Sequence, residues 1–264
     1  MSVQTALPTS MALRLVARQV MIQIKRRRDL GVLAIIVGLY LVGMISVSQV
    51  GIENPATATF LLNLGLTLAS LAAHIMTLGL AARQFPEEFE NRTLLTFLAR
   101  PLDRSTLVIG KWAACAACGC GVLVTVSLVA WLPAPKMESF DTVLLLQCLV
   151  LLGVSVSLLA ALAICSSLVA PRSVAFVGTA LLYLFGGKAL SLVRNLTSER
   201  TGGEAIRWLT GYVPDFSKLN LLTRLTDGQV ALSAPMFIGL VAYGALLIGL
   251  LLAVSTAVFQ RRSL

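Results

Sequence analysis

Charged residues are scarce in this chain: they make up 12% of its 264 residues, whereas hydrophobic residues make up 57%. Soluble domains carry about 25% charged residues, so a water-soluble fold of this size could not hide so much apolar surface. Lipid is therefore the expected solvent. The stretches that matter are about 20 residues long, because a helix of that length crosses a hydrocarbon layer of roughly 30 Å. The composition predicts an all-α, polytopic membrane protein.

The motifs of common catalytic sites are missing. No G-x-x-x-x-G-K-[ST] sequence is present, because the GGKA at 186–189 lacks both the spacing and the hydroxyl of a phosphate-binding loop. No H-E-x-x-H or G-x-S-x-G occurs, and the GVSVS at 153–157 departs from the second motif at its last position. We therefore expect no enzyme activity and no cofactor in this chain.

Metal ligands are few as well. His74 is the only histidine, and the five cysteines all lie within apolar runs. Cys115, Cys118 and Cys120 have a spacing that could hold a soft metal, but their neighbours in AACAACGCG are small. Small residues let helices approach closely in lipid, so packing is the favoured interpretation. It applies equally to a four-residue period in the last apolar stretch, which would face another span or a second copy of the chain: Ala245, Gly249, Ala253 and Ala257.

Six apolar stretches follow one another within a single domain over residues 1–264. We expect them to span the membrane at roughly 30–50, 58–82, 107–132, 142–169, 174–193 and 234–258. A basic amphipathic helix is expected to lie in the membrane interface at 9–29, and a solvated run of charge is the alternative there. No span has an aspartate or glutamate near its middle, which counts against a proton-coupled carrier, since such carriers need a titratable group at depth.

Lysine and arginine indicate the orientation of the spans. If the N-terminus is cytoplasmic, segments 1–29 and 83–111 hold six and five of the 21 basic residues, whereas the short outer loop 133–141 holds one. The segment 186–233 holds six, but long loops weigh little in the positive-inside rule. Both termini are therefore predicted inside. The aromatic and apolar residues of the outer segment 194–233 predict short interfacial or re-entrant helices.

Residues 83–106 interrupt the apolar pattern on the predicted cytoplasmic side. Pro86 suits the first turn of a helix, and the three glutamates within 87–90 complement the positive end of its dipole. Arg100 precedes a proline and should end this helix, and a new one can begin around 103–105. The sequence therefore predicts a bent elbow with a charged tip between two spans.

A more specific pattern lies within this elbow. It reads Glu88-Phe-Glu90-Asn-Arg-Thr93-Leu94, then Ala99-Arg-Pro101-Leu-Asp-Arg104, with Gly110-Lys111 opening the next span. The pattern resembles the cytoplasmic signature of type-two ABC-transporter permeases, the six-span membrane subunits of ABC exporters. Arg92 departs from that signature, because the family often has glycine there, and this favours a continuous helix through Thr93. The spans, the inward termini and the outer segment resemble the family too.

The resemblance implies a permease of an ATP-driven exporter that moves a lipid-like or other substrate across the plasma or bacterial inner membrane. Its partners would be a pair of ABC ATPase subunits that bind ATP and Mg²⁺, a second copy of the chain in a homodimer, and membrane lipid, but no nucleic acid. A solvated loop without a partner is the alternative for the elbow, and a membrane scaffold that docks a soluble partner without transport is the alternative function. The resemblance places the docking surface on Glu87, Glu88, Glu90, Arg92, Thr93, Arg100, Pro101, Asp103 and Arg104.

Overall fold

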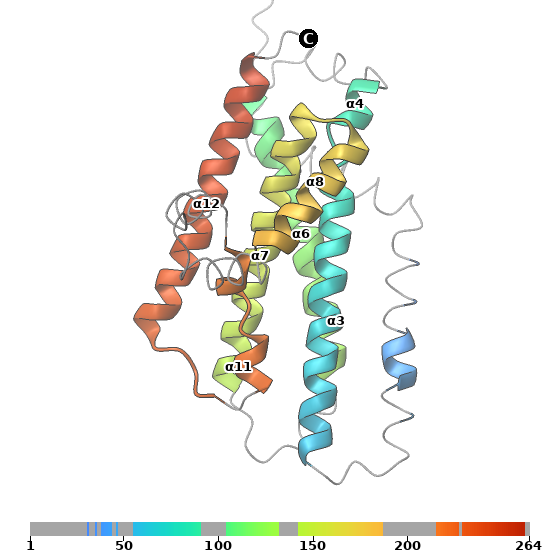
Figure 1. The fold of residues 1–264 in the computed structure, drawn as a ribbon, viewed down its shortest axis with the longest axis vertical. Helices are drawn as coiled ribbons and strands as arrows, with labels where there is room; N and C mark the ends of the chain where they lie inside the picture. Colours follow the sequence, from blue (N-terminus) through green and yellow to red (C-terminus); the bar gives the residue numbers. More distant parts are fainter. Residues whose placement is uncertain are drawn as a thin grey trace, which may run out of the picture.

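The computed structural model describes residues 55–90, 104–131, 142–186, 215–226 and 229–261, together with a few positions between 31 and 46. The regular elements in these ranges are all helices, as the composition predicts, and they form an elongated bundle (Figure 1). Four long helices pack together along its length: α3 (Pro55–Ala81), α6 (Arg104–Trp131), α7 (Thr142–Val169) and α12 (Ala234–Arg261).

The four long helices have the dimensions of membrane spans. Each has 27 or 28 residues, which is about 40 Å of helix at 1.5 Å per residue. Each is also apolar enough to cross a bilayer. Their ends lie within three residues of four of the stretches expected from the sequence, because apolar runs bounded by charge or proline define both limits.

Helix α7 lies at the centre of the bundle, in contact with α3, α6, α8 and α12. Its residues Leu158–Ile164 are buried without interruption, so the helix is enclosed on all sides over two turns. This explains why α7 is apolar all round instead of amphipathic. Helix α12 differs, because it buries one side only and leaves large apolar side chains exposed: Leu246, Leu250 and Val254 are among them. That exposed side suits contact with lipid or with another apolar helix.

Glycine allows α3, α6 and α7 to approach closely at one point. A Cβ atom added to Gly119 of α6 would collide with the Thr77 side chain of α3 and would lie 2.6 Å from Val156 Cγ1 of α7. Cys115, one turn earlier on α6, is fully buried in the same core. The contacts support the packing interpretation of the AACAACGCG stretch.

Helix α8 (Arg172–Leu184) turns back from α7 after Ala170 and Pro171, between the predicted spans 142–169 and 174–193. It has 13 residues, about 20 Å of helix, and is followed by a π-helical turn at 185–186. The remaining residues of the predicted span 174–193 lie outside the described part. A count of six spans stays a prediction.

The predicted interfacial helix at 9–29 and most of the first predicted span at 30–50 also lie outside the described residues. The described positions within that span are helical, and Tyr40 among them donates a hydrogen bond from its hydroxyl to Leu61 O at 3.3 Å. This bond ties the first stretch to α3.

The described part of the segment 194–233 contains two short helices, η3 (Phe216–Leu219) and α11 (Leu222–Thr226), which contact α7. A pair of hydrogen bonds holds the chain just before α12 against α7. Gln147 Nε2 donates to Leu232 O at 3.0 Å, and Leu232 N donates to Gln147 Oε1 at 2.8 Å. The side-chain amide thus pairs with the backbone as a neighbouring strand would.

Candidate functional site

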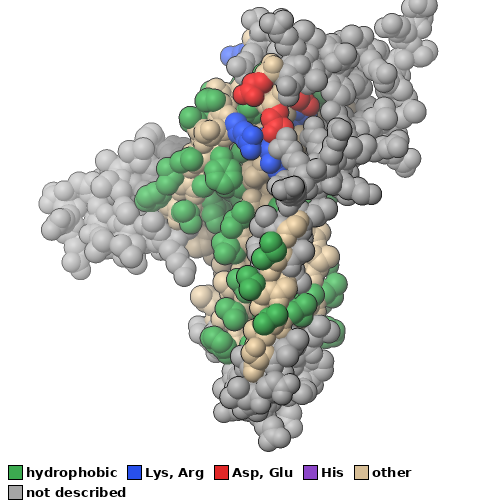
Figure 2. All heavy atoms as spheres, turned by 90° about the vertical axis from the view of Figure 1, so that its right-hand side faces the viewer, with side chains coloured by type: hydrophobic (Ala, Val, Ile, Leu, Met, Phe, Trp, Pro, Cys, Tyr) green, Lys and Arg blue, Asp and Glu red, His purple; other side chains and the backbone are tan. Residues whose placement is uncertain are grey.

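Charged side chains gather at one end of the bundle, where α3 ends, α6 begins and α12 ends. We call this the elbow end; it lies at the top of Figure 1, and Figure 2 shows acidic and basic side chains there above a largely apolar face. Beyond α3 the chain makes a tight turn, in which Gln84 N donates to Ala81 O at 3.3 Å, and enters α4 (Pro86–Glu90). Pro86 stands in the first turn of α4, as predicted, because its missing N–H group is not needed there.

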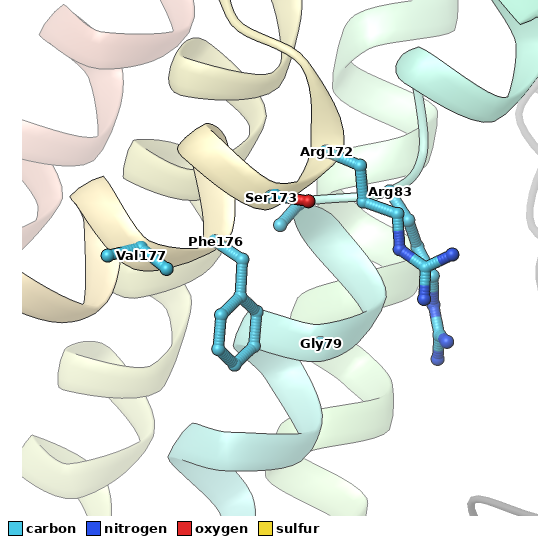
Figure 3. A pocket seen from close by; sticks show the side chains of 7 residues that line it. Gly79, Arg83, Arg172, Ser173, Phe176 and Val177 are labelled. Atoms are coloured by element: carbon cyan, nitrogen blue, oxygen red, sulfur yellow. The ribbon is translucent and has the colours of Figure 1, made fainter.

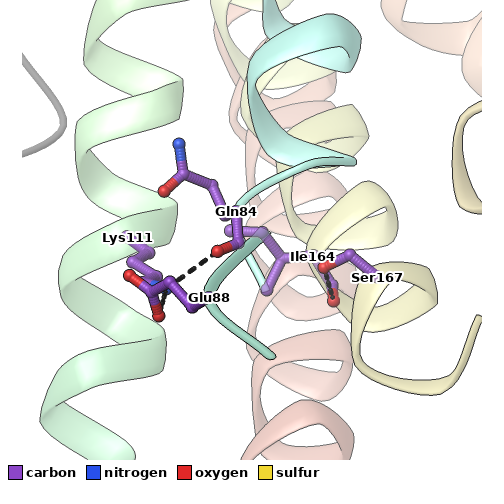
Figure 4. Close-up of polar contacts among 5 residues, drawn as sticks. All are labelled: Gln84, Glu88, Lys111, Ile164 and Ser167. Carbon is purple, nitrogen blue, oxygen red and sulfur yellow. Dashed lines mark hydrogen bonds and ion pairs between the residues drawn. The ribbon is translucent and has the colours of Figure 1, made fainter. Parts of the chain in front are cut away.

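A buried ion pair joins α4 to α6. The ammonium group of Lys111 contacts Glu88 Oε2, and both side chains are almost fully buried, at 3% and 7% exposure (Figure 4). Lys111 Nζ also donates a hydrogen bond to Gln84 O at 3.1 Å and lies 4.1 Å from the centre of the Phe85 ring. The cation therefore has a carboxylate, a carbonyl and an aromatic face as partners, which together offset the loss of its hydration.

An aromatic cluster continues from this pair to α12. Phe85 is fully buried, and its ring lies 5.4 Å from that of Phe259, near the end of α12. Arg104, the first residue of α6, donates from Nη1 to Phe259 O at 3.1 Å and to Gln260 O at 3.2 Å. Its guanidinium also lies 5.7 Å from the Phe259 ring centre. Arg104 thus satisfies carbonyl groups that the last turn of a helix leaves without intrahelical partners.

Both flanks of the elbow are therefore anchored in the bundle. The entry, at Glu88, is fixed to α6 through Lys111, and the exit, at Arg104, is fixed to α12. Residues 91–103 between these anchors are outside the described part. The two anchors thus connect the flanks of this segment to α6 and to α12.

The residues predicted to dock a partner have different surroundings at the elbow end. Glu90 is exposed, Glu87 is half-buried, and Glu88 is buried against Lys111. Arg104 is half-buried and bonded to α12. Their role in docking stays a prediction, as does that of the five remaining residues, which lie outside the described part: Arg92, Thr93, Arg100, Pro101 and Asp103.

Sequence reasoning missed Lys111 as the partner of Glu88. Lys111 had entered only as part of the Gly-Lys pair that opens the span. The signal was available, since a lysine inside an apolar stretch needs a partner, and ionisable residues within spans usually have a specific one. The nearest acidic residues along the chain, at 87, 88, 90 and 103, were the candidates.

A second feature, a cavity of about 500 Å³, lies between α3, α7, the end of α8 and the short helices η3 and α11. Volumes of this size are typical of small-molecule sites. Its lining combines apolar side chains with hydroxyl and amide groups: Asn63, Thr67, Leu152, Ser155, Tyr183, Leu184, Phe216, Ser217, Asn220, Leu222 and Thr223. None of these described lining residues carries a formal charge.

His74 supports one wall of this cavity. Its Nδ1 lies 2.7 Å from Ser70 O, which can only accept, so Nδ1 carries the proton and the neutral Nε2 accepts from Ser155 Oγ at 3.0 Å. The imidazole lies against the Tyr183 ring, with centroids 4.7 Å apart, and Tyr183 packs edge-on against Phe216 at 5.0 Å. The histidine thus acts as a helix–helix tie that positions two residues of the cavity.

A family model described as "ABC-2 family transporter protein" matches residues 23–187, more than half of the chain. No curated protein matches the sequence.

Proposed function

Because the chain belongs to the ABC-2 transporter family, we propose that it is the membrane subunit of an ATP-driven exporter worked by separate ATPase subunits. The elbow end would then face the cytoplasm, as the distribution of lysine and arginine indicates. The chain itself would supply the path through the membrane, and ATP and Mg²⁺ would bind to the partner.

The observation that carries this proposal is the double anchoring of the elbow. A segment that only connects two spans needs no buried ion pair at its entry and no arginine hydrogen-bonded to another helix at its exit. Here Glu88 and Lys111 fix one flank, and Arg104 fixes the other to the end of α12. A push on residues 91–103 would therefore be delivered to three long helices at once.

Docking of the ATPase can be tested at Glu90, which is exposed on α4. Among the described residues, its side chain makes no hydrogen bond or ion pair that a replacement would break. We expect an ABC ATPase to be encoded beside this chain, to co-purify with the wild-type protein in lipid nanodiscs and to hydrolyse ATP there. Glu90→Lys should reduce co-purification by roughly tenfold, the loss expected when one interfacial charge contact of about 1.4 kcal/mol is reversed.

Gln229→Lys is the control, because it adds a positive charge at an exposed position outside the elbow end. It should leave co-purification unchanged. If the wild-type chain captures no ATPase, the assignment as an exporter subunit is wrong. If the ATPase is captured but Glu90→Lys binds it equally well, α4 is not part of the docking surface.

The lining of the cavity between α3 and α7 favours an amphipathic molecule as the substrate. Its hydroxyl and amide groups suit an uncharged polar head, and its leucine and aromatic side chains suit an apolar tail. The matching assay follows a fluorescent lipid across proteoliposomes that contain the permease and its ATPase. ATP-dependent movement supports transport, whereas ATP hydrolysis without movement of any probe supports the scaffold alternative.

A homodimer is the arrangement that the exposed side of α12 supports. Four small residues of α12, spaced four apart, were predicted to face another helix. All four are exposed and therefore lie on the side away from the described bundle: Ala245, Gly249, Ala253 and Ala257. Cysteine introduced at Gly249 should form a disulfide-linked dimer in native membranes, whereas cysteine at Gly244, which faces α7, should not.

A further inference from the structure

The cavity between α3 and α7 differs in charge from a smaller cavity at the elbow end. The smaller one, of about 360 Å³, has Arg83 and Arg172 in its lining, and Figure 3 shows both side chains extending in the same direction. The larger one, of about 500 Å³, has no charged residue among its described lining residues. Its polar groups are hydroxyls and amides, and they come from α3, α7, α8 and the outer segment.

These uncharged polar groups lie well within the length of the membrane spans. Asn63 follows Pro55, the start of α3, by eight residues, which is about 12 Å along the helix. Ser155 stands at the middle of α7, about 20 Å from either end. Hydrocarbon offers no hydrogen bonds to groups at such a depth, so they require water or the polar part of a ligand.

Several of these groups have hydrogen-bonding capacity to spare. Within the described part of the chain, the side-chain amide of Asn63 makes no hydrogen bond, so its donors and its acceptor all remain open. The Asn220 amide accepts from Leu222 N at 3.0 Å through its oxygen, which leaves its NH₂ group to donate. The Tyr183 hydroxyl has no partner among the described residues either, although its ring is packed on both sides. The cavity therefore presents donors and acceptors from three separate elements.

The remaining lining is apolar and reaches the exposed side of α8. Leu152 and Leu222 are buried in the core, whereas Leu184, at the end of α8, is 65% exposed. The apolar surface continues at the next residue, Phe185, which is 60% exposed. An acyl chain that left the cavity along this surface would bury apolar area, which is favourable.

We propose that the cavity selects a lipid whose head is uncharged and carries several hydroxyl groups, as the sugar of a neutral glycolipid does, and that Asn63 is the residue that recognises this head. The inference rests on the proposed function, in which the same cavity holds the substrate. Hydroxyl groups match the lining, because each one rotates to donate or to accept as its neighbour requires. A charged head is disfavoured, because a charge at this depth is costly without a countercharge, and the described lining supplies none.

The test measures lipid retention by native mass spectrometry on the purified full-length chain in lauryl dimethylamine oxide, a detergent without a sugar head. Four probes share the same acyl chains and differ in the head: monoglucosyl diacylglycerol, diacylglycerol, phosphatidylcholine and phosphatidylglycerol. The wild-type chain should retain the glucosyl lipid about tenfold better than diacylglycerol, the effect of one or two added hydrogen bonds. It should also retain it better than phosphatidylglycerol, whose head combines hydroxyl groups with a charge.

Two variants locate the selectivity. Asn63→Leu keeps a branched side chain without its amide and should bring retention of the glucosyl lipid close to that of diacylglycerol, with diacylglycerol itself retained as before. Tyr183→Phe keeps the packed ring, removes one hydroxyl and should lower the same ratio severalfold. Thr125→Val is the control, because this exposed hydroxyl of α6 lies outside the cavity and bonds to carbonyl groups of its own helix.

The proposal is overturned if the wild-type chain retains phosphatidylglycerol as well as the glucosyl lipid, or if it retains none of the probes, which would leave the cavity to water. It is overturned equally if Asn63→Leu and Tyr183→Phe both keep the wild-type ratio. The measurement involves neither ATP nor an ATPase, so a lack of selectivity here is distinguishable from a failure to capture the ATPase.

Discussion

The ion pair between Glu88 and Lys111 allows the sharpest test of how the elbow end is held together. Replacing Lys111 by methionine keeps the length and apolar stem of the side chain but removes the ammonium group. The Glu88 carboxylate, 7% exposed, would then be left in the bundle without its cation. Removing one partner of a buried ion pair costs about 3–5 kcal/mol, because the remaining charge is neither hydrated nor paired.

The double replacement should behave differently. In Glu88→Leu with Lys111→Met no charge is buried, so most of the loss should be recovered. About 1 kcal/mol should remain, because Gln84 O would lose the hydrogen bond that Lys111 now donates at 3.1 Å. The two single replacements together therefore cost far more than the double one, and the coupling free energy should exceed about 2 kcal/mol.

The measurement is a double-mutant cycle of unfolding free energies, obtained by SDS titration of the purified chain in mixed micelles. Glu87→Gln serves as the control on the neighbouring residue. Its ion pair with Arg172 is long and the Arg172 side chain is 57% exposed, so the loss of this pair should cost less than about 1 kcal/mol. Additive single replacements, or a Glu87 effect as large as that of Lys111→Met, would refute the assignment of a buried, coupled pair.

Three further replacements test other contacts. Gly119→Ala should destabilise the bundle by about 1–3 kcal/mol in the same titration, because its methyl group collides with α3 and α7, whereas Gly121→Ala, which meets no atom within 4 Å, should not. Gln147→Leu should cost about 1–3 kcal/mol and raise the hydrogen exchange of the Leu232 amide, since this replacement removes both side-chain hydrogen bonds. Arg104→Met should expose the end of α12 to added protease several-fold faster, because its last carbonyls lose their donor.

The long helices were predictable because their causes are local. The apolar run of α7 is bounded by Asp141 and Pro171, and the helix occupies Thr142–Val169 as expected. α4 likewise begins at Pro86, where its sequence places a first turn. Apolar composition indicates that a segment lies in lipid, and a proline or a charged residue indicates where its helix ends. Neither inference needs knowledge of the rest of the chain.

The end of α8 was not predictable by the same means. Apolar residues continue through Phe185 and beyond, but the α-helix gives way to a π-helical turn there. Composition reports that a segment prefers lipid or the protein interior, and it does not report whether the backbone stays in one helix. Gly186 was the local sign of the change from an α-helix to a π-helical turn, since glycine weakens a helix by about 1 kcal/mol.

The site depended on contacts between segments distant along the chain. The acids of α4 were identified as important, but three neighbouring glutamates cannot be told apart by sequence alone. The turn at 82–85 directs Glu88 inward onto Lys111 and leaves Glu90 outside. The hydrogen bond from Arg104 to Phe259 O on α12 joins residues 155 positions apart, and no periodicity in either helix indicates it.

These anchors also connect the elbow to the larger cavity. α3 carries the elbow entry at one end and cavity residues Asn63 and Thr67 toward its other end. A continuous helix of 27 residues transmits a tilt along its length, because its backbone hydrogen bonds resist bending, and α3 contains no proline after its first residue. In the proposed exporter we expect a displacement applied at Glu88 to reach α3 through the turn at 82–85 and to move the Asn63 wall relative to α7. The same push that reaches the elbow in the proposed exporter would thereby change the width of the cavity proposed to hold its substrate.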